Sequence, residues 1–405
     1  MLSHAEVLAS LEPVANEVLS IAGANAREIE LAIRERVDPD QVTFLSAVIG
    51  LQPKAHRKFG SGFWWCDERS LAQATHQRVA SLKASWLSGF NVFDICCGIG
   101  ADALATARSL GRGNSLLAVD SDPLTAAMAM RNLAMHLPVD AQWQVNCMDA
   151  AEVQLRSESL IHLDPDRRTK QGRKTRPEDY SPSWEVVETL INQCDGAVAK
   201  IAPAADIEDH PNRHRVWISY SSSVREQTIL TGRAIESASK SLSLDLPIGG
   251  RSAVIVCKQT SHVFAADRAR CEASQIGSSV TDIKSPLGYI IAPDPAIRAA
   301  GLTEAFAERH GLSTLGGPAG FLTSDTPVEG PLAICRPVLW SGSSDDRKLR
   351  RTLRDLDSYP ASVKTRGAAV DANTLERRYR TCGETPVTLW IGKTGKRQYA
   401  VISEA

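Results

Sequence analysis

The stretch DICCGIGAD, residues 94–102, places two glycines one residue apart between a short apolar run and a helical pattern. Gly98, Gly100 and Ala103 satisfy the GxGxxG/A pattern of a loop that joins a strand to a helix and holds a nucleotide against its backbone. Such a loop belongs to a chain in which strands and helices alternate. It therefore predicts an α/β fold, and it leaves open which nucleotide is bound.

From residue 89 onward, short apolar runs of strand length alternate with helical patterns. Alternation of this kind builds a doubly wound, Rossmann-like parallel sheet, which binds ligands at the carboxyl ends of its strands. Two further runs, HRVWISYSSS (214–223) and RSAVIVCK (251–258), are interpreted as a closing pair of strands, so this domain is predicted over 89–260. The strand-like runs before them are NVFDIC, SLLAVD, AQWQVN, LIHLD and GAVAKIA.

The regions on either side have different patterns. Residues 1–88 carry apolar side chains at three- and four-residue spacing, which predicts a helical region, and FGSGFWW (59–65) is interpreted as a turn packed against the next domain. Residues 331–405 alternate as β-α-β-α-β-β, which predicts a small α+β domain. Residues 261–330 are interpreted as a connector that contains a helix.

Composition limits the kind of protein. A chain of 405 residues with 43% hydrophobic content can fill more than one core, and 46 basic against 47 acidic residues confine any nucleic-acid affinity to local patches. The nine cysteines show no CxxC pair, which argues against a disulfide framework or a structural metal site and favours the reducing cytoplasm. No apolar run approaches the length of a membrane span, so we expect no membrane partner.

Acidic residues around the glycine loop indicate the nucleotide. A dinucleotide would place its pyrophosphate at the helix N-terminus, where Asp94 and Asp102 would repel it. S-adenosylmethionine carries an ammonium and a sulfonium instead, so carboxylates favour it. Asp120 ends the second strand and suits the ribose of either cofactor, and Asp149 follows the third strand, where an acid can accept the adenine amino group. We therefore predict S-adenosylmethionine, with an NAD(P)-dependent oxidoreductase as the alternative.

Three segments resemble motifs I, II and IV of class I methyltransferases: VFDICCGIGADALATA, LLAVDSDPLTAAMAMRNL and LIHLDPDRR. Others, including LAQATHQRVASLKA, KIAPAADI, APDPAIRAAGL and SVKTRGAAVDANTLERRYR, resemble methyltransferases that end in a ferredoxin-like connector and a THUMP-like domain. The resemblance covers nearly all of the chain after about residue 40. It implies an S-adenosylmethionine-dependent enzyme with the connector at 261–330 and the THUMP-like domain at 331–405. By analogy, it implies RNA, tRNA or rRNA, as partner.

The motifs assign the cofactor to the strand ends. Cys96 stands where the methyltransferase motif usually has its first glycine, and both Cys96 and Cys97 are most simply small buried residues. The residues predicted to bind the cofactor are Asp94, Cys96, Cys97, Gly98, Gly100, Asp102, Asp120, Ser121 and Asp149.

The segment LDPDRRTKQGRKTR, residues 163–176, follows the fourth strand and so faces the methyl group. Asp164 can accept a hydrogen bond from an amine or ring N–H and align it, and Asp166 is a possible second acceptor. The same segment has a net charge of +4, which favours contacts with phosphates over a merely solvated loop. Its predicted RNA-binding residues are Arg167, Arg168, Arg173 and Lys174.

The residue that follows Asp164-Pro165-Asp166 gives information about which group is methylated. Enzymes that methylate exocyclic base amines usually have an aromatic residue there, and this chain has Arg167. Tyr180 or Trp184 could supply the missing ring. No Pro-Cys follows the fourth strand, which argues against the cysteine-based route to 5-methylcytosine. Lone histidines such as His162 and His210 are interpreted as core or loop residues.

A second basic region lies near the C-terminus. Residues 347–380 have a net charge of +6 within a chain of net charge −1. Ser343 and Asp346 form a capping-box pattern before the first helix there, and helical spacing puts several arginines on one face. We predict that Arg350, Arg351 and Arg354 bind RNA, with a solvated helix face as the alternative. An RNA-binding protein with a vestigial, non-catalytic fold also stays open.

Overall fold

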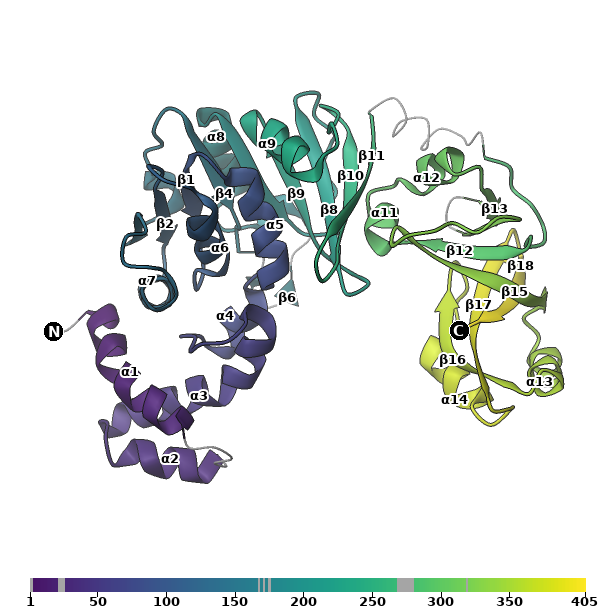
Figure 1. Cartoon of the computed structure of the whole chain (residues 1–405), viewed down its shortest axis with the longest axis horizontal. Helices are drawn as coiled ribbons and strands as arrows, with labels where there is room; N and C mark the ends of the chain where they lie inside the picture. The colour runs from purple at the N-terminus through teal and green to yellow at the C-terminus, as the bar shows by residue number, and fades with distance from the viewer. Residues whose placement is uncertain are drawn as a thin grey trace. The chain divides into compact units, whose positions relative to one another are not determined.

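The computed structural model describes residues 3–20, 26–166, 168–169, 172–173, 176–267, 280–317 and 320–405 (Figure 1). The chain forms two compact units, and each is considered by itself. The first comprises residues 1–218 and 226–249, and the second comprises 219–225 and 250–405. Within the described residues, no helix is long and apolar enough to cross a membrane.

The N-terminal region is helical, as its periodicity predicts. The turn at 59–65 packs inward, because Trp64 and Trp65 are almost fully buried and the backbone N–H of Trp65 donates to the Asn132 side chain at 2.8 Å. This confirms the interpretation of that turn as a packing element. The helices are α1 His4–Ser20, α2 Ala26–Arg34, α3 Pro39–Phe59, α4 Glu68–Gln73 and α5 Gln77–Leu87.

The sheet of the first unit confirms the predicted doubly wound fold. Its strands follow the order β8-β9-β7-β4-β1-β2-β3, and β1, β2, β3, β4 and β7 are parallel. The order reverses at β1, whose neighbours are β2 and β4, so the carboxyl ends of these strands form a topological switch point. The strands are β1 Asn91–Ile95, β2 Leu116–Asp120, β3 Trp143–Cys147, β4 Ser159–Leu163, β7 Gly196–Ile201, β8 Arg213–Tyr220 and β9 Ser223–Thr231.

Helices cover both faces of this sheet (Figure 1). One face packs on α8, where Val187, Leu190 and Ile191 meet the strand residues Phe93 and Ile161 in one apolar cluster. The other face holds α5 and α6, which lie against each other. The remaining elements are α6 Ala101–Ser109, α7 Pro123–His136, α8 Trp184–Gln193, α9 Arg233–Leu242, the short ladder β5 Arg168–Thr169 with β6 Gly172–Arg173, and the 3₁₀ turns η1 Ala150–Glu152 and η2 Pro177–Asp179.

The expected closing pair of strands was incomplete. The sequence analysis missed β9, which pairs antiparallel with β7 and stands beside β8. Glu226, Gln227 and Thr228 gave this segment a polar appearance, yet all three side chains are buried. The strand therefore buries polar side chains beside the apolar Ile229 and Leu230, and hydrophobic periodicity does not detect that mixture.

The second unit contains a hairpin and a larger sheet. Its seven-stranded sheet has the order β13-β14-β12-β15-β18-β17-β16, so strands from 289–315 and from 333–404 share one sheet. The predicted β-α-β-α-β-β order is present as β15, α13, β16, α14, β17 and β18. The elements are β10 Arg251–Val256, β11 Ser261–Ala266, β12 Tyr289–Pro293, α11 Pro295–Ala299, α12 Thr303–Arg309, β13 Ser313–Leu315, β14 Phe321–Ser324, β15 Ala333–Ser343, α13 Asp346–Asp355, β16 Ser358–Thr365, α14 Ala372–Tyr379, β17 Thr385–Thr394 and β18 Arg397–Glu404.

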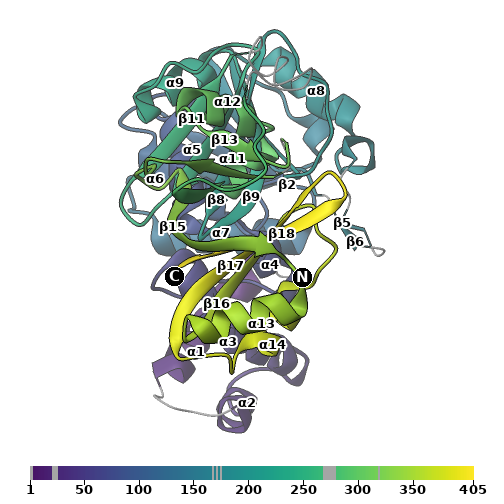
Figure 2. The same cartoon turned by 90° about the vertical axis from the view of Figure 1, so that its right-hand side faces the viewer.

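The two faces of this sheet differ. Helices α13 and α14 lie side by side against one face (Figure 2), where Leu349 and Tyr379 pack on Leu389. Trp390, the next residue along β17, belongs to a separate cluster with Phe321 on the opposite face. The expected capping box was wrong in its first residue, because Asp345 is the N-cap of α13 and its carboxylate accepts from the Lys348 N–H at 3.0 Å.

Candidate functional site

The glycine loop lies at the switch point and is held in place by α7. Gly98 and Gly100 have φ values of 57° and 82°, which L side chains rarely adopt. A Cβ on Gly100 would come within 2.7 Å of a Leu133 methyl group in α7 and within 3.4 Å of Ala129, so the close approach of α7 adds to the positive φ in favouring glycine here. Asn132 donates to the carbonyl of Ile99 at 2.9 Å. A Cβ on Gly98 would instead meet no described atom within 4 Å, so that side of the loop is open.

Asp120 connects the end of β2 to this loop. One carboxylate oxygen accepts from the Gly98 N–H at 3.0 Å, and the other accepts from the Asp122 N–H at the same distance. Burial raises the pKa of Asp120, against these hydrogen bonds. Each oxygen can accept a further hydrogen bond. The structure thus places Asp120 beside the open side of the glycine loop, as its predicted role requires.

Asp94, at the other side of the loop, is fully buried. Its Oδ1 lies 2.7 Å from Nδ1 of His162 on the neighbouring strand β4, whereas its Oδ2 has no hydrogen-bond partner in the described part of the chain. Burial raises the pKa of Asp94, and His162 opposes that shift. A buried carboxylate oxygen without a donor is costly. Asp94 therefore retains an unused acceptor atom beside the glycine loop.

Strand register collects the charged residues on the α5/α6 face of the sheet. Asp94 pairs with His162, His162 pairs with Val198, and Lys200 follows Val198 by two residues, so their side chains share a face. Lys200 in turn pairs with Thr228, two residues after Glu226. Four strands thus point ionisable groups at the same buried space.

Lys83 of α5 lies at the centre of this space, and its side chain is 1% exposed. Its ammonium lies 3.0 Å from Asp102, 3.1 Å from Glu226 and 3.1 Å from Nε2 of His162. Burial alone would lower the pKa of Lys83, but Asp102, Glu226 and Asp164 raise it overall. Burial and Lys83 would lower the pKa of His162, yet Asp94 and Asp102 raise it.

This arrangement corrects the expectation for Asp102. We predicted that Asp102 would face the cofactor from the first turn of the helix, but it turns toward α5 and forms the ion pair with Lys83. Burial would raise the pKa of Asp102, and the Lys83 charge lowers it well below its usual range. The buried lysine needs a counter-charge, and Asp102 supplies it.

Asp164 stands at the outer end of the same charged cluster. Its Oδ2 accepts from Nζ of Lys200 at 2.5 Å, and Lys200 also donates to the Thr75 hydroxyl at 3.2 Å. The side chain of Asp164 is 22% exposed, whereas that of Lys200 is 6% exposed. The lysine therefore holds the carboxylate from the buried side and leaves it accessible from the other. We define the buried charge cluster as Asp94, His162, Lys83, Asp102, Glu226, Lys200 and Asp164.

Asp166 has a different environment. Its two carboxylate oxygens accept from Arg69 at 2.6 Å and from Gln73 at 2.9 Å, both on α4. These contacts connect the segment after β4 to the N-terminal helices. The structure thus separates the two aspartates that the sequence analysis treated together.

The other predicted cofactor residues lie around the loop. Ser121 and Asp149 are exposed at the ends of β2 and β3, and the Asp149 carboxylate caps η1 by accepting from the Ala151 N–H at 2.8 Å. Burial raises the pKa of Cys96 and of Cys97 well above the ordinary value, so both thiols stay protonated. This agrees with their interpretation as small packing residues.

The two aromatic residues proposed to stack a base, Tyr180 and Trp184, pack against the core of the first unit. Tyr180 is 5% exposed, and its hydroxyl accepts from the Ala202 N–H at 3.0 Å, so it belongs to the core; the expectation for Tyr180 was wrong. Trp184 packs edge-on against Tyr180 with ring centroids 6.5 Å apart.

The predicted RNA-binding residues are only partly described. The side chains of Arg167, Arg168, Arg173 and Lys174 lie outside the described residues. On α13, Arg350 bonds to Asp346 at 3.0 Å and lies over the Tyr379 ring, so part of its charge is compensated. Arg351 and Arg354 are exposed, and Arg351 lies 3.7 Å from Asp355.

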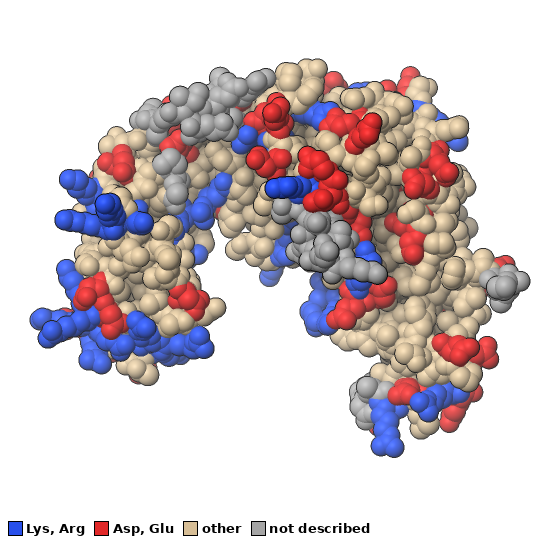
Figure 3. All heavy atoms as spheres, turned by 180° about the vertical axis from the view of Figure 1, so that it is seen from behind, with Lys and Arg blue, Asp and Glu red and all other residues tan. Residues whose placement is uncertain are grey.

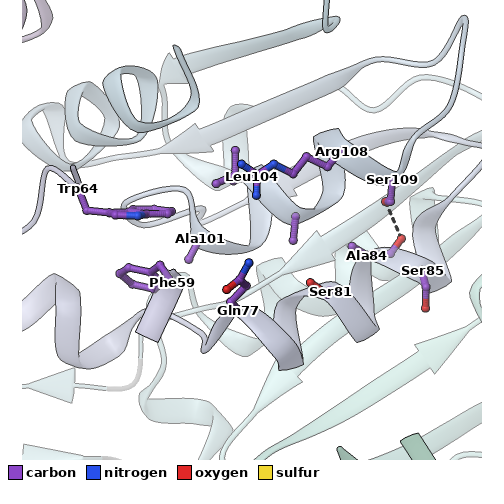
Figure 4. A pocket seen from close by; sticks show the side chains of 11 residues that line it. Phe59, Trp64, Gln77, Ser81, Ala84, Ser85, Ala101, Leu104, Arg108 and Ser109 are labelled. Carbon is purple, nitrogen blue, oxygen red and sulfur yellow. Dashed lines mark hydrogen bonds between the residues drawn. The ribbon is translucent and has the colours of Figure 1, made fainter. Parts of the chain in front are cut away.

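A cavity of about 230 Å³ lies between α5 and α6 (Figure 4). The rings of Phe59 and Trp64 border one end of it, and Ser109 lies at the other. None of the predicted cofactor residues is among the described residues that line it. It is therefore separate from the strand-end site.

Three residues of the buried charge cluster were not predicted: Lys83, Lys200 and Glu226. The interpretation of His162 as a core residue is confirmed, because it is 1% exposed and both ring nitrogens have partners. A signal was present for Lys83, because helical spacing places it on the buried face of α5 with Val79 and Trp86. His162 and Lys200 interrupt otherwise apolar strand runs. A charged residue inside a buried strand or helix face indicates a buried partner, and several such residues together indicate a cluster.

Comparison with known proteins agrees with this geometry. No family model that was compared with the sequence matches it. Two proteins from strains of Mycobacterium tuberculosis, both described as uncharacterised S-adenosylmethionine-dependent methyltransferases, are 29% identical over 346 residues, covering 83% of this chain and 86% of theirs. A solved structure from Porphyromonas gingivalis, provisionally described as a methyltransferase, superposes with a TM-score of 0.76 over 100% of this chain and 99% of its own, at 16% identity. The chain is thus a homologue of S-adenosylmethionine-dependent methyltransferases and has the Rossmann-like fold of the class I enzymes.

Proposed function

We propose that this protein is an S-adenosylmethionine-dependent methyltransferase that acts on RNA. The observation that carries the proposal is the meeting of three acidic groups at the strand switch point. Asp94 has a buried oxygen without a donor, Asp120 lies beside the open side of Gly98, and Asp164 presents a half-buried carboxylate held by Lys200.

The residues at the loop fit the cofactor. The unpartnered oxygen of Asp94 suits the ammonium of the methionine part, and Asp120 suits the ribose hydroxyls as an acceptor. The open side of Gly98 lets the ligand approach the backbone. When bound, S-adenosylmethionine supplies a methyl group activated on a sulfonium. Asp149 retains acceptor capacity for the adenine amino group.

Asp164 positions the methyl acceptor, which is the nucleophile on the substrate that receives the methyl group. An in-line displacement needs the nucleophile aligned with the donor, and a carboxylate that accepts its N–H fixes that direction. Because Lys200 donates to Oδ2 of Asp164, the N–H of the methyl acceptor is expected to donate to Oδ1 of Asp164. The Asp164 carboxylate also takes the proton that the nucleophile loses. Asp166, which is bonded to α4, holds the segment rather than the acceptor.

The RNA assignment rests on charge. The basic run at 167–176 follows Asp164 in the chain, and residues 347–380 carry a net charge of +6. Basic side chains gather on the second unit, whereas acidic ones are more frequent over the first unit in the same view (Figure 3). Phosphate contacts of this kind give affinity without sequence preference, and the resemblance to THUMP-like proteins favours RNA over DNA.

Replacing Asp94 by asparagine should weaken S-adenosylmethionine binding about 10- to 150-fold, since a charge-assisted hydrogen bond is worth about 1.5–3 kcal/mol. Isothermal titration calorimetry measures this. 5′-Methylthioadenosine lacks the ammonium, so its affinity should be the same for the Asp94→Asn variant and the native protein. Equal losses for both ligands would show that Asp94 supports the loop and does not bind the ammonium.

The oxidoreductase alternative predicts a different ligand. The glycine loop alone is compatible with a dinucleotide, but buried Asp94 would lie close to its pyrophosphate. The same calorimetry with NADH and NADPH separates the two functions. Binding of either one, with no heat from S-adenosylmethionine, would overturn the methyltransferase.

Nucleoside analysis tests the RNA substrate. RNA from cells that lack the gene should have lost one methylated nucleoside, which mass spectrometry detects, and the native gene should restore it. The Asp164→Asn gene should not restore it. An unchanged set of methylated nucleosides in tRNA, rRNA and the remaining RNA would contradict RNA as the substrate.

A further inference from the structure

A group of basic residues in the second unit lies on the sheet face opposite α13 and α14. Arg366 follows β16 and is 6% exposed; its guanidinium lies 4.6 Å from the centroid of the Phe321 ring and donates to the carbonyl of Gly320 at 2.6 Å. Lys364, two residues earlier, lies 5.6 Å from the centroid of the Trp390 ring. The two rings meet edge-on with centroids 5.1 Å apart, so the cations flank one aromatic pair.

Strand register brings a third cation to this face. Arg336 on β15 pairs with Ile290 on β12, and Ile290 pairs with Thr323 on β14. Directly paired residues share a face, and Phe321 lies two residues before Thr323. Arg336 therefore points to the side of the sheet that holds Phe321.

Arg298 of α11 is the fourth cation of the group, because its charge repels that of Arg366. Burial and the nearby charge of Arg298 together lower the pKa of Arg366 to about 9. Burial also lowers the pKa of Lys364, with Arg366 and Arg336 adding repulsion. We call Arg298, Arg336, Lys364 and Arg366 the basic cluster.

Among the described residues, no carboxylate forms an ion pair with any member of the basic cluster. A carboxylate whose charge is felt in this region is that of Asp282, because both Asp282 and Arg366 influence the pKa of Tyr399. Oδ1 of Asp282 already accepts hydrogen bonds from Thr314, Gly316 and Gly317. Buried or half-buried cations are normally paired in proteins. The members of this cluster repel one another, and no described side chain acts as their counter-ion, so the cluster is suited to an anion.

A suitable anion carries several negative charges and is bound by ionic contacts rather than by aromatic stacking. Trp390 and Phe321 are 0% and 1% exposed, so their rings are unavailable for stacking on a base. Three cations from α11, β15 and β16 instead offer donors to several oxygens of neighbouring phosphates, and the buried Arg366 adds its positive charge beneath them. Arg336 and Lys364 are half-buried, and Arg298 is exposed, so a phosphate can reach them.

We propose that the basic cluster binds the phosphodiester backbone of the RNA substrate, and that it rather than the arginine face of α13 is the main RNA contact of the second unit. This rests on the proposed function for the identity of the polyanion. The contrast with α13 is physical: two of its three predicted RNA-binding arginines, Arg350 and Arg351, have carboxylates nearby, whereas no described carboxylate forms an ion pair with a member of the basic cluster.

The test uses the full chain and a fluorescently labelled single-stranded RNA titrated at several salt concentrations. Replacing Arg336 by glutamine and Lys364 by methionine together should flatten the slope of log affinity against log salt by about 1.4, since each lost phosphate contact removes about 0.7. The matched control is Arg351→Gln with Arg354→Gln on α13, which should change the slope by less than about half of that amount. A larger change in the α13 control than in the cluster variant would overturn the proposal.

Melting temperature provides a second readout that separates binding from folding. Removing two mutually repelling cations should leave the melting temperature of the cluster variant unchanged or higher. Inorganic tripolyphosphate should raise the melting temperature of the native protein and have little effect on the variant. If tripolyphosphate stabilises the native protein through this cluster but RNA does not bind, the RNA assignment fails while the anion site stands. If tripolyphosphate stabilises both equally, the anion site itself is wrong.

Discussion

Replacing Asp164 by asparagine is expected to lower the rate of methyl transfer about 100- to 10,000-fold, the range for removing a positioned proton acceptor. Asparagine keeps the size of the side chain but loses the charge that attracts the acceptor's N–H. Lys200 then lacks its carboxylate partner at 2.5 Å, although Glu226 lies 4.0 Å away and retains part of the compensation. Single-turnover rates with saturating S-adenosylmethionine measure the effect.

Asp164 should act on turnover and not on cofactor binding, so the dissociation constant for S-adenosylmethionine should change by only a few-fold. The matched control is Asp166→Asn, in the same segment. Its carboxylate is bonded to Arg69 and Gln73, so its loss should reduce the rate by less than about tenfold. A variant at Asp164 that retains turnover but loses cofactor affinity would assign this residue to the cofactor instead.

Replacing Lys83 by methionine is expected to lower the free energy of unfolding by about 3–5 kcal/mol, because it leaves Asp102 and Glu226 buried without their cation. Methionine fills nearly the same volume, so the effect reports charge rather than a cavity. Urea unfolding, followed by circular dichroism, measures it.

The control for Lys83 is an exposed ion pair. Arg34 and Glu30 on α2 form such a pair, and Arg34→Ala should cost less than about 1 kcal/mol. A loss below about 1 kcal/mol for Lys83→Met would mean that the carboxylates around it become protonated at little expense. The buried charge cluster would then contribute little to stability.

Much of the fold could be predicted from local signals. The glycine loop at 98–100 and the strand–helix alternation identified the doubly wound sheet, and the last six elements were found in their correct order. These signals are local in the chain: apolar periodicity, a turn that demands glycine, and a helix that follows. The fold follows from them because they agree with one another.

The interior of the site could not be predicted in the same way. Asp102 looked like a cofactor residue because it follows the glycine loop, but its direction is set by Lys83, which is nineteen residues earlier on another helix. Glu226 is buried against Lys83 and Lys200, which are distant in the chain, as well as beside Thr228 of β9, whose hydroxyl donates to it at 3.1 Å. Pairings between distant ionisable residues leave no periodic trace, so only the tertiary structure shows them.

The basic regions illustrate the same limit. The net charge of 347–380 was visible in the sequence, but it counted Arg350, Lys364 and Arg366 as equivalent. In the structure Arg350 is paired with Asp346, while Lys364 and Arg366 lie near Arg336 and form no ion pair with a carboxylate in the described part of the chain. Summed charge therefore located the region but not the residues that retain uncompensated charge.

The most direct test of the account is the transfer of a tritiated methyl group from S-adenosylmethionine to RNA isolated from cells that lack the gene. The native protein should incorporate label into material that ribonuclease destroys, Asp164→Asn should incorporate almost none, and RNA from cells with the gene should accept much less. If the protein binds S-adenosylmethionine but no RNA fraction acquires ribonuclease-sensitive label, RNA is not its substrate.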